Sequence, residues 1–398
     1  MIYLLILFYL LILSYQYDFL KKSAQRSLHY FIVMAVLILV AGFRYRIGID
    51  SIRYEMDFEG IPTLGTLSLN DFSEQKYDPL YLLLAVICRS ISNEFWVLQM
   101  AQAVLVNIIF FRFFKKNTDN IFLAILIYYF ILYAGNMFET MRESCAVAMM
   151  LLSWEFYKKN RRFVVLFFFS LAFLFHSSAI LLFFVYIPII LKIDRRIIFS
   201  KNTLLIVSLI LLFAFTIQDF FLDNLVFFAL NSRFADKIDL YTSNNMFEDK
   251  LNIFGVIASI VLYGIIPYIC ASTIRKTKDS YKLEYFLVIE LLCAVMAFPI
   301  YIFYRYVNYF FPFVILAMCK SLSFKCVNIF GITKFSTKRI AIWLILSFPF
   351  VITQTKLMLS SEWPSGPQVY SRYYPYSSIF TKKEDADREA IFSQYIWW

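Results

Sequence analysis

The stretch GNMFETMRESCAVAMM, residues Gly135–Met150, places three charged side chains between two long apolar runs. These side chains are Glu139, Arg142 and Glu143. An Arg at the centre of a membrane-spanning helix costs roughly 2.5 to 3.5 kcal/mol, so such residues usually face a bundle interior or a water-filled cavity. Two interpretations follow. Either a functional cavity surrounds Arg142, or the charges cap two helices in a short external turn where water solvates them.

The composition around this stretch is that of a membrane protein. The 398 residues are 61% hydrophobic and 17% charged, with a mean hydropathy of +0.67. Soluble domains are typically about 45–50% apolar and about 25% charged. Apolar runs recur along the chain at close to the ~20 residues that an α-helix needs to cross the hydrocarbon. We therefore predict an all-α, polytopic membrane bundle.

About twelve segments are predicted to span the membrane. The first is interpreted as a retained span with its N-terminus outside. Clusters of Lys and Arg follow alternate gaps, at 21–26, 112–116, 158–162, 192–201, 275–282 and 320–339. The positive-inside rule assigns these gaps to the cytoplasm. The predicted spans are 2–20, 27–43, 95–114, 120–138, 141–157, 163–175, 178–191, 203–220, 252–273, 283–301, 304–321 and 339–355.

The segment 79–92 resembles a further span, but counting it would invert every later gap. It is short and contains Arg89, so we interpret it as a re-entrant or interfacial helix on the outer side. Residues 1–398 are expected to form one membrane domain, with external loops at 44–78 and 218–250. An external tail at 356–398 is rich in Tyr and Trp, which suit either the headgroup layer or a sugar-stacking surface.

Several classes of function lack support in the sequence. The six Cys are scattered without metal-ligand spacing, so neither a disulfide framework nor a metal site is predicted. No P-loop, GxSxG, HExxH or DxD-type motif occurs, which leaves nucleotide and serine hydrolysis and metal-dependent transfer unsupported. The net charge of +10 is explained by topology signals, so no nucleic-acid partner is predicted.

The stretch FRYRIGIDSIRYEMDF, residues Phe43–Phe58, follows the second predicted span on the outer side. Arg44 and Arg46 lie close to Asp50, and Gly48 allows a sharp turn immediately before that aspartate. Guanidinium groups grip phosphate oxygens through two parallel hydrogen bonds. The segment could thus bind a pyrophosphate or a sugar, or it could be a loop that folds by its own ion pairs.

Two further polar residues are predicted on the same outer face as Arg142. His176 follows a thirteen-residue apolar run that is shorter than the hydrocarbon thickness, so we expect it below the outer surface in a pocket. It is either a neutral side chain bonded to a backbone carbonyl or an acid, base or phosphate ligand. Arg305 lies in an outer turn between two apolar runs. We expect these sites to converge.

In these segments the chain resembles the EpsG-like branch of the Wzy-type polysaccharide polymerases. That family more often has Thr where Ile49 stands, Glu where Asp78 stands and Gln where Glu143 stands, which leaves open whether Glu143 acts as a carboxylate. The matching pieces follow family order along nearly the whole chain: Arg44-x3-Gly48-x-Asp50-x3-Tyr54, Asp78-Pro79-Leu80-Tyr81, Asn136 with Arg142-Glu143, Leu171-Ala172 with His176-Ser177-Ser178-Ala179, Arg305-Tyr306 with Tyr309, and Tyr374-Pro375-Tyr376.

The resemblance implies a glycosyltransferase of the bacterial inner membrane that needs no metal, nucleotide or other cofactor. It would join undecaprenyl-pyrophosphate-linked repeat units into a surface polysaccharide on the external, periplasmic face. Arg142 and Arg305 would stabilise the departing pyrophosphate. His176, Asp50 or Glu143 would take the proton from the attacking sugar hydroxyl. The implied substrate contacts are Arg44, Arg46, Tyr54, Asn136, Glu139, Tyr306 and Tyr309.

The lipid-linked glycan and the bilayer are the expected partners, with a flippase and a chain-length regulator as candidate protein partners. Two rival functions remain open. A lipid-linked sugar flippase would show basic residues at several depths of a cavity and pseudo-repeated halves. A membrane acyltransferase that modifies the glycan would also use a membrane-facing His, with further polar residues inside its spans.

Overall fold

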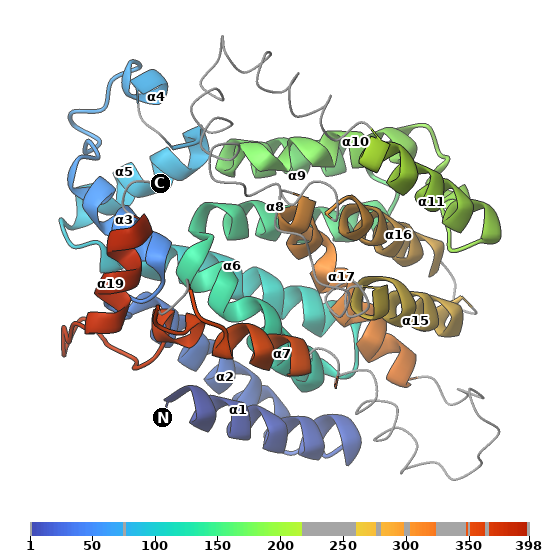
Figure 1. Ribbon diagram of the computed structural model, residues 1–398, viewed down its shortest axis with the longest axis horizontal. Coiled ribbons are helices and arrows are strands. Elements are labelled where there is room, and N and C mark those ends of the chain that lie inside the picture. Colours follow the sequence, from blue (N-terminus) through green and yellow to red (C-terminus); the bar gives the residue numbers. More distant parts are fainter. Residues whose placement is uncertain are drawn as a thin grey trace. The chain divides into compact units, whose positions relative to one another are not determined.

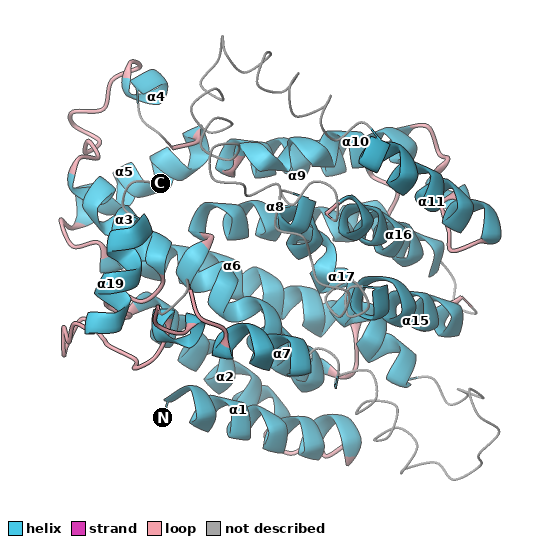
Figure 2. Cartoon of the chain, in the orientation of Figure 1, coloured by secondary structure: helices cyan, strands magenta, loops and turns pink. Residues whose placement is uncertain are grey.

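The computed structural model describes residues 2–74, 77–216, 260–275, 280–297, 303–323, 348, 351–362 and 366–395. Within these ranges the regular elements are helices, and only isolated bridges join extended segments (Figure 2). The all-α prediction is therefore confirmed for the described chain. Its contacts divide into two compact units. We call Met1–Ile190 with Gln354–Trp397 the first unit and Leu191–Thr353 the second unit.

The first unit contains most of the described helices (Figure 1). Several are prolonged by short π-helical or 3-10 turns. The bounds are α1 Ile2–Leu13 with η1 Ser14–Phe19, α2 Arg26–Gly42, α3 Ile49–Glu59, α4 Asp71–Glu74, α5 Pro79–Ile91, α6 Trp96–Asn117, α7 Ile121–Tyr128 with η2 Tyr129–Tyr133 and η3 Gly135–Glu139, α8 Met141–Lys158, α9 Arg162–Phe175, η4 Ser177–Ile180, α10 Leu181–Ile190, η7 Val369–Arg372 and α19 Ala386–Tyr395.

Helix α8 forms the centre of the first unit. It packs against α9 and α6, and α6 packs in turn against α2 (Figure 1). Ser144, Ala146 and Ala148 are fully buried on α8. Small side chains let helix backbones approach closely. The packing fixes the first turn of α8, and therefore Arg142, relative to the neighbouring helices.

The second unit contains η5 Asp194–Arg196, α11 Lys201–Thr216, η6 Ile260–Ile265, α15 Ile266–Ile274, α16 Ser280–Met296 and α17 Phe303–Ser323. Helix α17 packs against α15 and α16. Phe286 and Phe313 stack at this contact with ring centroids 4.4 Å apart. Outside the apolar contact, Arg275 pairs with the Glu284 carboxylate, whose Oε1 also accepts a hydrogen bond from the Phe199 N–H at 2.8 Å.

Two described helical segments, Ile2–Phe19 and Trp96–Asn117, are long and apolar enough to cross a membrane. Helices also occupy most of the other predicted spans that fall in the described ranges. Each of these helices is either too short or not apolar enough to cross a membrane by the same measure. The number of twelve spans therefore stays a prediction. The segment 79–92 is the thirteen-residue helix α5, as expected, and it packs against α6 and α9. The external loop 218–250 and most of the span 339–355 lie outside the described residues.

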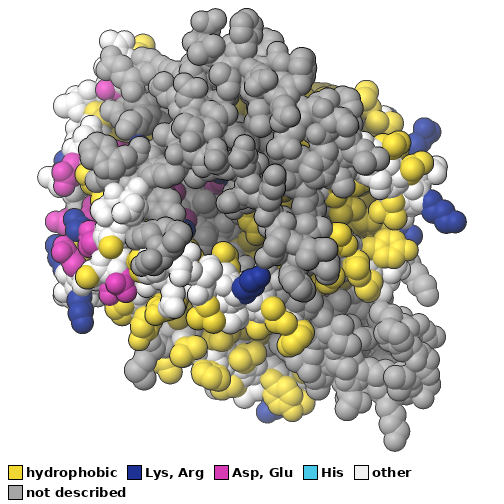
Figure 3. Space-filling view, viewed as in Figure 1, with side chains coloured by type: hydrophobic (Ala, Val, Ile, Leu, Met, Phe, Trp, Pro, Cys, Tyr) yellow, Lys and Arg dark blue, Asp and Glu magenta, His cyan; other side chains and the backbone are white. Residues whose placement is uncertain are grey.

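The two ends of α8 carry different polar groups. At its first turn Arg142 meets the Tyr54 hydroxyl, whereas at its last turn the Lys158 ammonium donates to Asn117 Oδ1 at 2.7 Å. Eighteen helical residues separate these ends by about 27 Å, close to the ~30 Å of hydrocarbon. Acidic side chains gather at the end of the first unit that carries α3 and α19 (Figure 3). The orientation of these two ends relative to the membrane stays a prediction.

Single cysteines test that orientation. In a Cys-free background, a probe replacing Leu69, which is 88% exposed, should react with an impermeant maleimide added outside intact spheroplasts. A probe replacing the exposed Asn160 at the basic end of α8 should react only after lysis. Labelling of the Asn160 probe in intact spheroplasts would overturn the orientation and restore 79–92 as a span.

Candidate functional site

Arg142 lies in the first turn of α8 and is held by groups from two other segments. Its Nε donates to the Tyr54 hydroxyl of α3 at 2.9 Å, and its Nη1 lies 3.9 Å from the Asp78 carboxylate. The guanidinium carbon lies 5.6 Å and 5.3 Å from the ring centroids of Tyr54 and Tyr77. About a fifth of the side chain is exposed. The planar group is thus oriented by aromatic faces and a carboxylate without being sealed off.

The two tyrosine rings that contact Arg142 are held in place by other residues. The Tyr77 hydroxyl donates to Asp57 Oδ2 at 3.2 Å, and Tyr81 packs against both Tyr54 and Tyr77. Three separate pieces of the family resemblance contain these residues: Tyr54, the Asp78–Tyr81 segment and Arg142. The structure brings these pieces together around one guanidinium. Tyr77 was missed from the sequence, although it directly precedes Asp78 there.

Glu139 ends the helical turn η3, just before α8. Its Oε2 accepts a hydrogen bond of 3.3 Å from the Asp50 N–H at the start of α3. The Tyr373 phenol and the Arg372 guanidinium both favour the charged form of this carboxylate. Oε1 is buried and has no hydrogen-bond partner within the described part of the chain. Burial, followed by repulsion from Asp50, raises the pKa of Glu139 to about 6, while Arg372, Tyr373 and the hydrogen bond from the Asp50 N–H act in the opposite direction.

Gly48 makes the sharp turn that the sequence predicted before Asp50. It adopts φ +86°, and a Cβ there would overlap the carbonyl group of Phe138. Its N–H donates to the Arg372 carbonyl at 3.0 Å. The backbones of the 43–58 segment, of η3 and of the C-terminal segment therefore meet at this glycine, next to Glu139.

The C-terminal segment 366–395 forms part of the site. It pairs with the 43–58 segment through an antiparallel bridge between Arg44 and Ser378. Backbone bonds run from the Tyr45 N–H to the Ser377 carbonyl at 2.9 Å and from the Ile379 N–H to the Phe43 carbonyl at 3.0 Å. Figure 1 shows α19 beside α3, which agrees with their contacts. No pattern in the sequence predicted this pairing.

The aromatic residues of this segment divide between the site and the surface. Tyr373 packs against Phe138 at 6.0 Å, and the Tyr376 hydroxyl donates to the Val40 carbonyl at 3.1 Å. Tyr374 is 50% exposed and Tyr370 is 38% exposed. Among the tyrosines of this segment whose exposure the structure describes, Tyr370 and Tyr374 are the exposed ones, and a role of the tail in the headgroup layer or in sugar stacking stays a prediction. Trp363, Trp397 and Trp398 lie outside the described residues.

Arg44 and Arg46 make different kinds of contact inside the protein. The buried Arg44 donates to the Ala41 carbonyl at 2.5 Å and lies 5.4 Å from the Phe138 ring centroid. Arg46 bonds Glu55 of α3 at 3.1 Å and Glu384 of the tail at 3.1 Å. Only the Arg46–Glu55 contact is an ion pair within the 43–58 segment, as one alternative expected, and substrate binding by either Arg stays a prediction.

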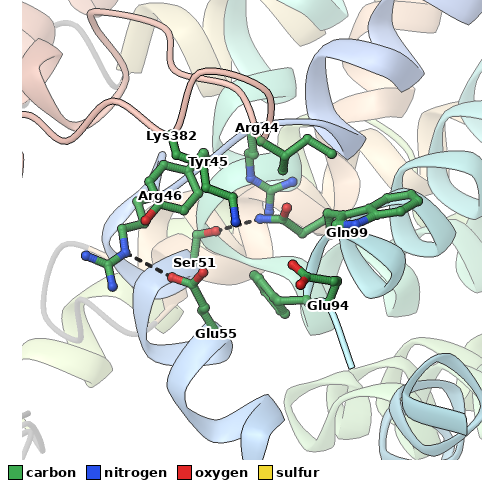
Figure 4. A pocket seen from close by; sticks show the side chains of 11 residues that line it. Arg44, Tyr45, Arg46, Ser51, Glu55, Glu94, Gln99 and Lys382 are labelled. Atoms are coloured by element: carbon green, nitrogen blue, oxygen red, sulfur yellow. Dashed lines mark hydrogen bonds and ion pairs between the residues drawn. The ribbon is translucent and has the colours of Figure 1, made fainter. Parts of the chain in front are cut away.

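A small pocket opens beside these arginines. It has a cavity volume of about 40 Å³, room for a few water molecules, and lies between the start of α3, the start of α6 and the tail (Figure 4). Glu94, Gln99 and Lys382 line it, and Gln99 Nε2 donates to Ser51 Oγ at 3.1 Å. Arg46 points its guanidinium toward Glu55 and away from Gln99 (Figure 4).

The structure places His176 at a helix junction. It follows α9, and its Nδ1 accepts the Ser178 N–H at 3.1 Å and contacts Ser178 Oγ at 2.6 Å, which caps η4. Neither sequence interpretation predicted a capping hydrogen bond to Nδ1. The bond is nevertheless closer to the interpretation of His176 as a neutral side chain bonded to the backbone than to its interpretation as an acid, base or phosphate ligand. Its role as a base stays a prediction.

Asn136 and Glu143 are both buried near Arg142. Gln102 Nε2 on α6 donates to the Asn136 carbonyl at 3.1 Å and to Ser144 Oγ at 2.8 Å. Gln102 was missed from the sequence. With Gln99 it forms an i, i+3 pair of amides inside a predicted span, and this spacing was the available signal.

Arg305, Tyr306 and Tyr309 belong to α17 in the second unit. Arg305 is exposed and Tyr309 is buried, with the Tyr306 and Tyr309 ring centroids 6.1 Å apart. Their convergence with Arg142 and His176 stays a prediction. Within the described residues no group of His, Cys, Asp and Glu side chains could hold a metal ion.

Comparison with known proteins gives one match. Residues 27–378 match the model of the EpsG family, a range that includes the Gly48 turn, Arg142, His176 and Arg305. No curated protein and no solved structure matches the chain. Because the family model covers most of the sequence, the chain belongs to the EpsG family.

Proposed function

We propose that this protein is a polysaccharide polymerase that transfers a growing glycan from undecaprenyl pyrophosphate to a hydroxyl of a lipid-linked repeat unit. Family membership supports a polymerase-like glycosyltransferase in polysaccharide biosynthesis. The observation that carries the proposal is the oriented guanidinium of Arg142, with the Glu139 carboxylate three residues before it in the chain. The guanidinium could stabilise a departing anion, and the carboxylate could accept the proton of an attacking hydroxyl.

Arg142 suits a pyrophosphate leaving group for two reasons. Its planar fork can donate two parallel hydrogen bonds to phosphate oxygens. It also lies at the N-terminus of the eighteen-residue α8, where backbone N–H groups and the helix dipole favour negative charge. The 3.9 Å separation from Asp78 is long for an ion pair, so phosphate oxygens can compete with that carboxylate. Charge that develops on the leaving group would be stabilised there.

A lipid-linked donor must reach this site from the bilayer. Helices α1 and α9 expose large apolar side chains, among them Leu4 at 59%, Phe8 at 61% and Phe163 at 82%. Contiguous exposed apolar surface marks membrane or partner contact. Together with the family match, this surface supports a membrane protein. The bacterial inner membrane, the periplasmic active face and the upstream flippase and chain-length regulator belong to the proposal.

Reconstitution tests the proposed function. The purified chain in nanodiscs should convert an undecaprenyl-pyrophosphate-linked repeat unit into a ladder of longer lipid-linked glycans and release undecaprenyl pyrophosphate. The ladder should form without nucleotide and in the presence of EDTA, with empty nanodiscs as the control. Absence of the ladder, together with movement of the lipid-linked unit across liposomes that contain the protein, would replace the polymerase with a flippase.

A further inference from the structure

Glu139 combines a fixed carboxylate oxygen with one that makes no hydrogen bond. Oε2 accepts the Asp50 N–H at the start of α3, whereas the buried Oε1 has no hydrogen-bond partner among the residues that the structure describes. Buried polar atoms are nearly always hydrogen-bonded, so an exception calls for an explanation. A carboxylate oxygen that lacks a donor inside the protein is suited to accept a hydroxyl proton from outside it.

We propose that Glu139 is the general base of the transfer and that Arg372 and Tyr373 of the C-terminal segment position it. The inference rests on the proposed polymerase function. The acceptor hydroxyl gives its proton to Oε1 while its oxygen forms the new bond to the anomeric carbon of the donor. The bond from that carbon to pyrophosphate breaks, and its electron pair leaves with the lipid pyrophosphate. Glu139 then releases the proton to water.

A purely structural role would explain only half of this geometry. The bond from the Asp50 N–H shows that Glu139 caps α3 from another element, and negative charge near a helix N-terminus is favourable. A neutral glutamine amide oxygen could accept the same hydrogen bond. Capping therefore does not require a carboxylate, and it does not use Oε1.

The charged surroundings of Glu139 keep it ready to titrate near neutrality. Asp50 of α3 repels the charged form, while Arg372 and Tyr373 of the tail stabilise it. Arg372 is anchored by Glu362, with Nη2 and Oε2 2.5 Å apart, so the tail presents this cation from a fixed position. The resulting pKa of about 6 leaves the carboxylate mostly ionised at pH 7 yet basic enough to take a proton.

The alternative bases are less suited by their contacts. His176 Nδ1 already accepts two contacts from Ser178 at the junction of α9 and η4. Asp50 lies in the first turn of α3, and its own backbone N–H is the donor to Glu139 Oε2. Glu139 is the described carboxylate near Arg142 that has both a buried, partnerless oxygen and charged groups that tune it.

Glu139→Gln tests the proposal because it keeps an oxygen for the Asp50 N–H and removes the base. In the reconstituted assay kcat should fall by roughly 100-fold to 10,000-fold, whereas binding of the lipid-linked repeat unit should change less than about threefold. The wild-type kcat should fall as the pH drops through about 6, and this acid limb should vanish in the variant. Glu59→Gln, an exposed neutralisation at the end of α3, is the matched control and should leave kcat unchanged.

Tyr373→Phe supplies a second test that does not depend on folding of Glu139→Gln. The phenol stabilises the charged carboxylate, so its removal should raise the pKa of Glu139 and move the acid limb of kcat to higher pH. A wild-type enzyme that makes no ladder would refute the proposed function itself. If the wild type makes a ladder, two results would each refute Glu139 as the base. One is a Glu139→Gln rate within tenfold of wild type, and the other is an unmoved acid limb in Tyr373→Phe. Neither result would contradict the polymerase function.

Discussion

Cells carrying Arg142→Lys are expected to lose long polysaccharide chains while the protein stays at its normal level in the membrane. Lysine keeps one charge but cannot donate a planar pair of hydrogen bonds. It would also lose the bond to the Tyr54 hydroxyl and the flat packing over the Tyr54 and Tyr77 rings. Loss of one oriented group that stabilises developing charge typically costs about 100-fold to 1000-fold in kcat.

The cellular measurement separates polymerisation from transport. Where the pathway ligates repeat units to a surface acceptor, Arg142→Lys cells should still display single units, because flipping occurs upstream. Arg161→Lys, an exposed substitution beyond the other end of α8, is the matched control and should leave chain length unchanged. If single units also disappear at normal protein level, the defect lies in transport and the polymerase proposal fails.

The sequence predicted Arg142 as the centre of the site for a physical reason. A charge between two apolar runs is costly, so its position can be read without any knowledge of the fold. The positions of helices α2, α5, α6 and α9 also followed from apolar runs and their polar ends. The Gly48 turn followed from the backbone freedom of glycine. Each of these inferences depends on residues that are close in the sequence.

The rest of the fold and of the candidate site depends on contacts between residues that are far apart in the sequence. Arg46 pairs with Glu384, and Glu139 meets Tyr373, across more than two hundred residues. No local period or spacing predicts such a pairing. The Tyr and Trp content of the tail suits either the headgroup layer or a sugar-stacking surface, and neither interpretation predicts a backbone contact. In the structure its backbone pairs with the 43–58 segment, and the Arg372 carbonyl accepts the Gly48 N–H next to Glu139.

Gly48→Ala should destabilise the first unit and suppress polymerisation together. At φ +86° and ψ 137° an alanine backbone is strained by about 1–3 kcal/mol. Its Cβ would also overlap the backbone carbonyl of Phe138, which cannot rotate away as a side chain can. The collision is relieved only if the 43–58 segment moves away from η3. Asp50 and Glu139 would then separate, since the bond between them bridges these two segments.

The matched control for this substitution is Gly65→Ala, in the loop region 44–78 that also contains Gly48. A Cβ at Gly65 meets nothing within 4 Å and requires no unusual φ, so this variant should melt and polymerise like the wild type. Gly48→Ala should lower the melting temperature of the detergent-purified protein, and its kcat should be at least tenfold lower even well below melting. Wild-type melting and kcat in Gly48→Ala would show that the turn can relax. In that case the close meeting of Gly48, Phe138 and the tail could not be what holds Asp50 against Glu139.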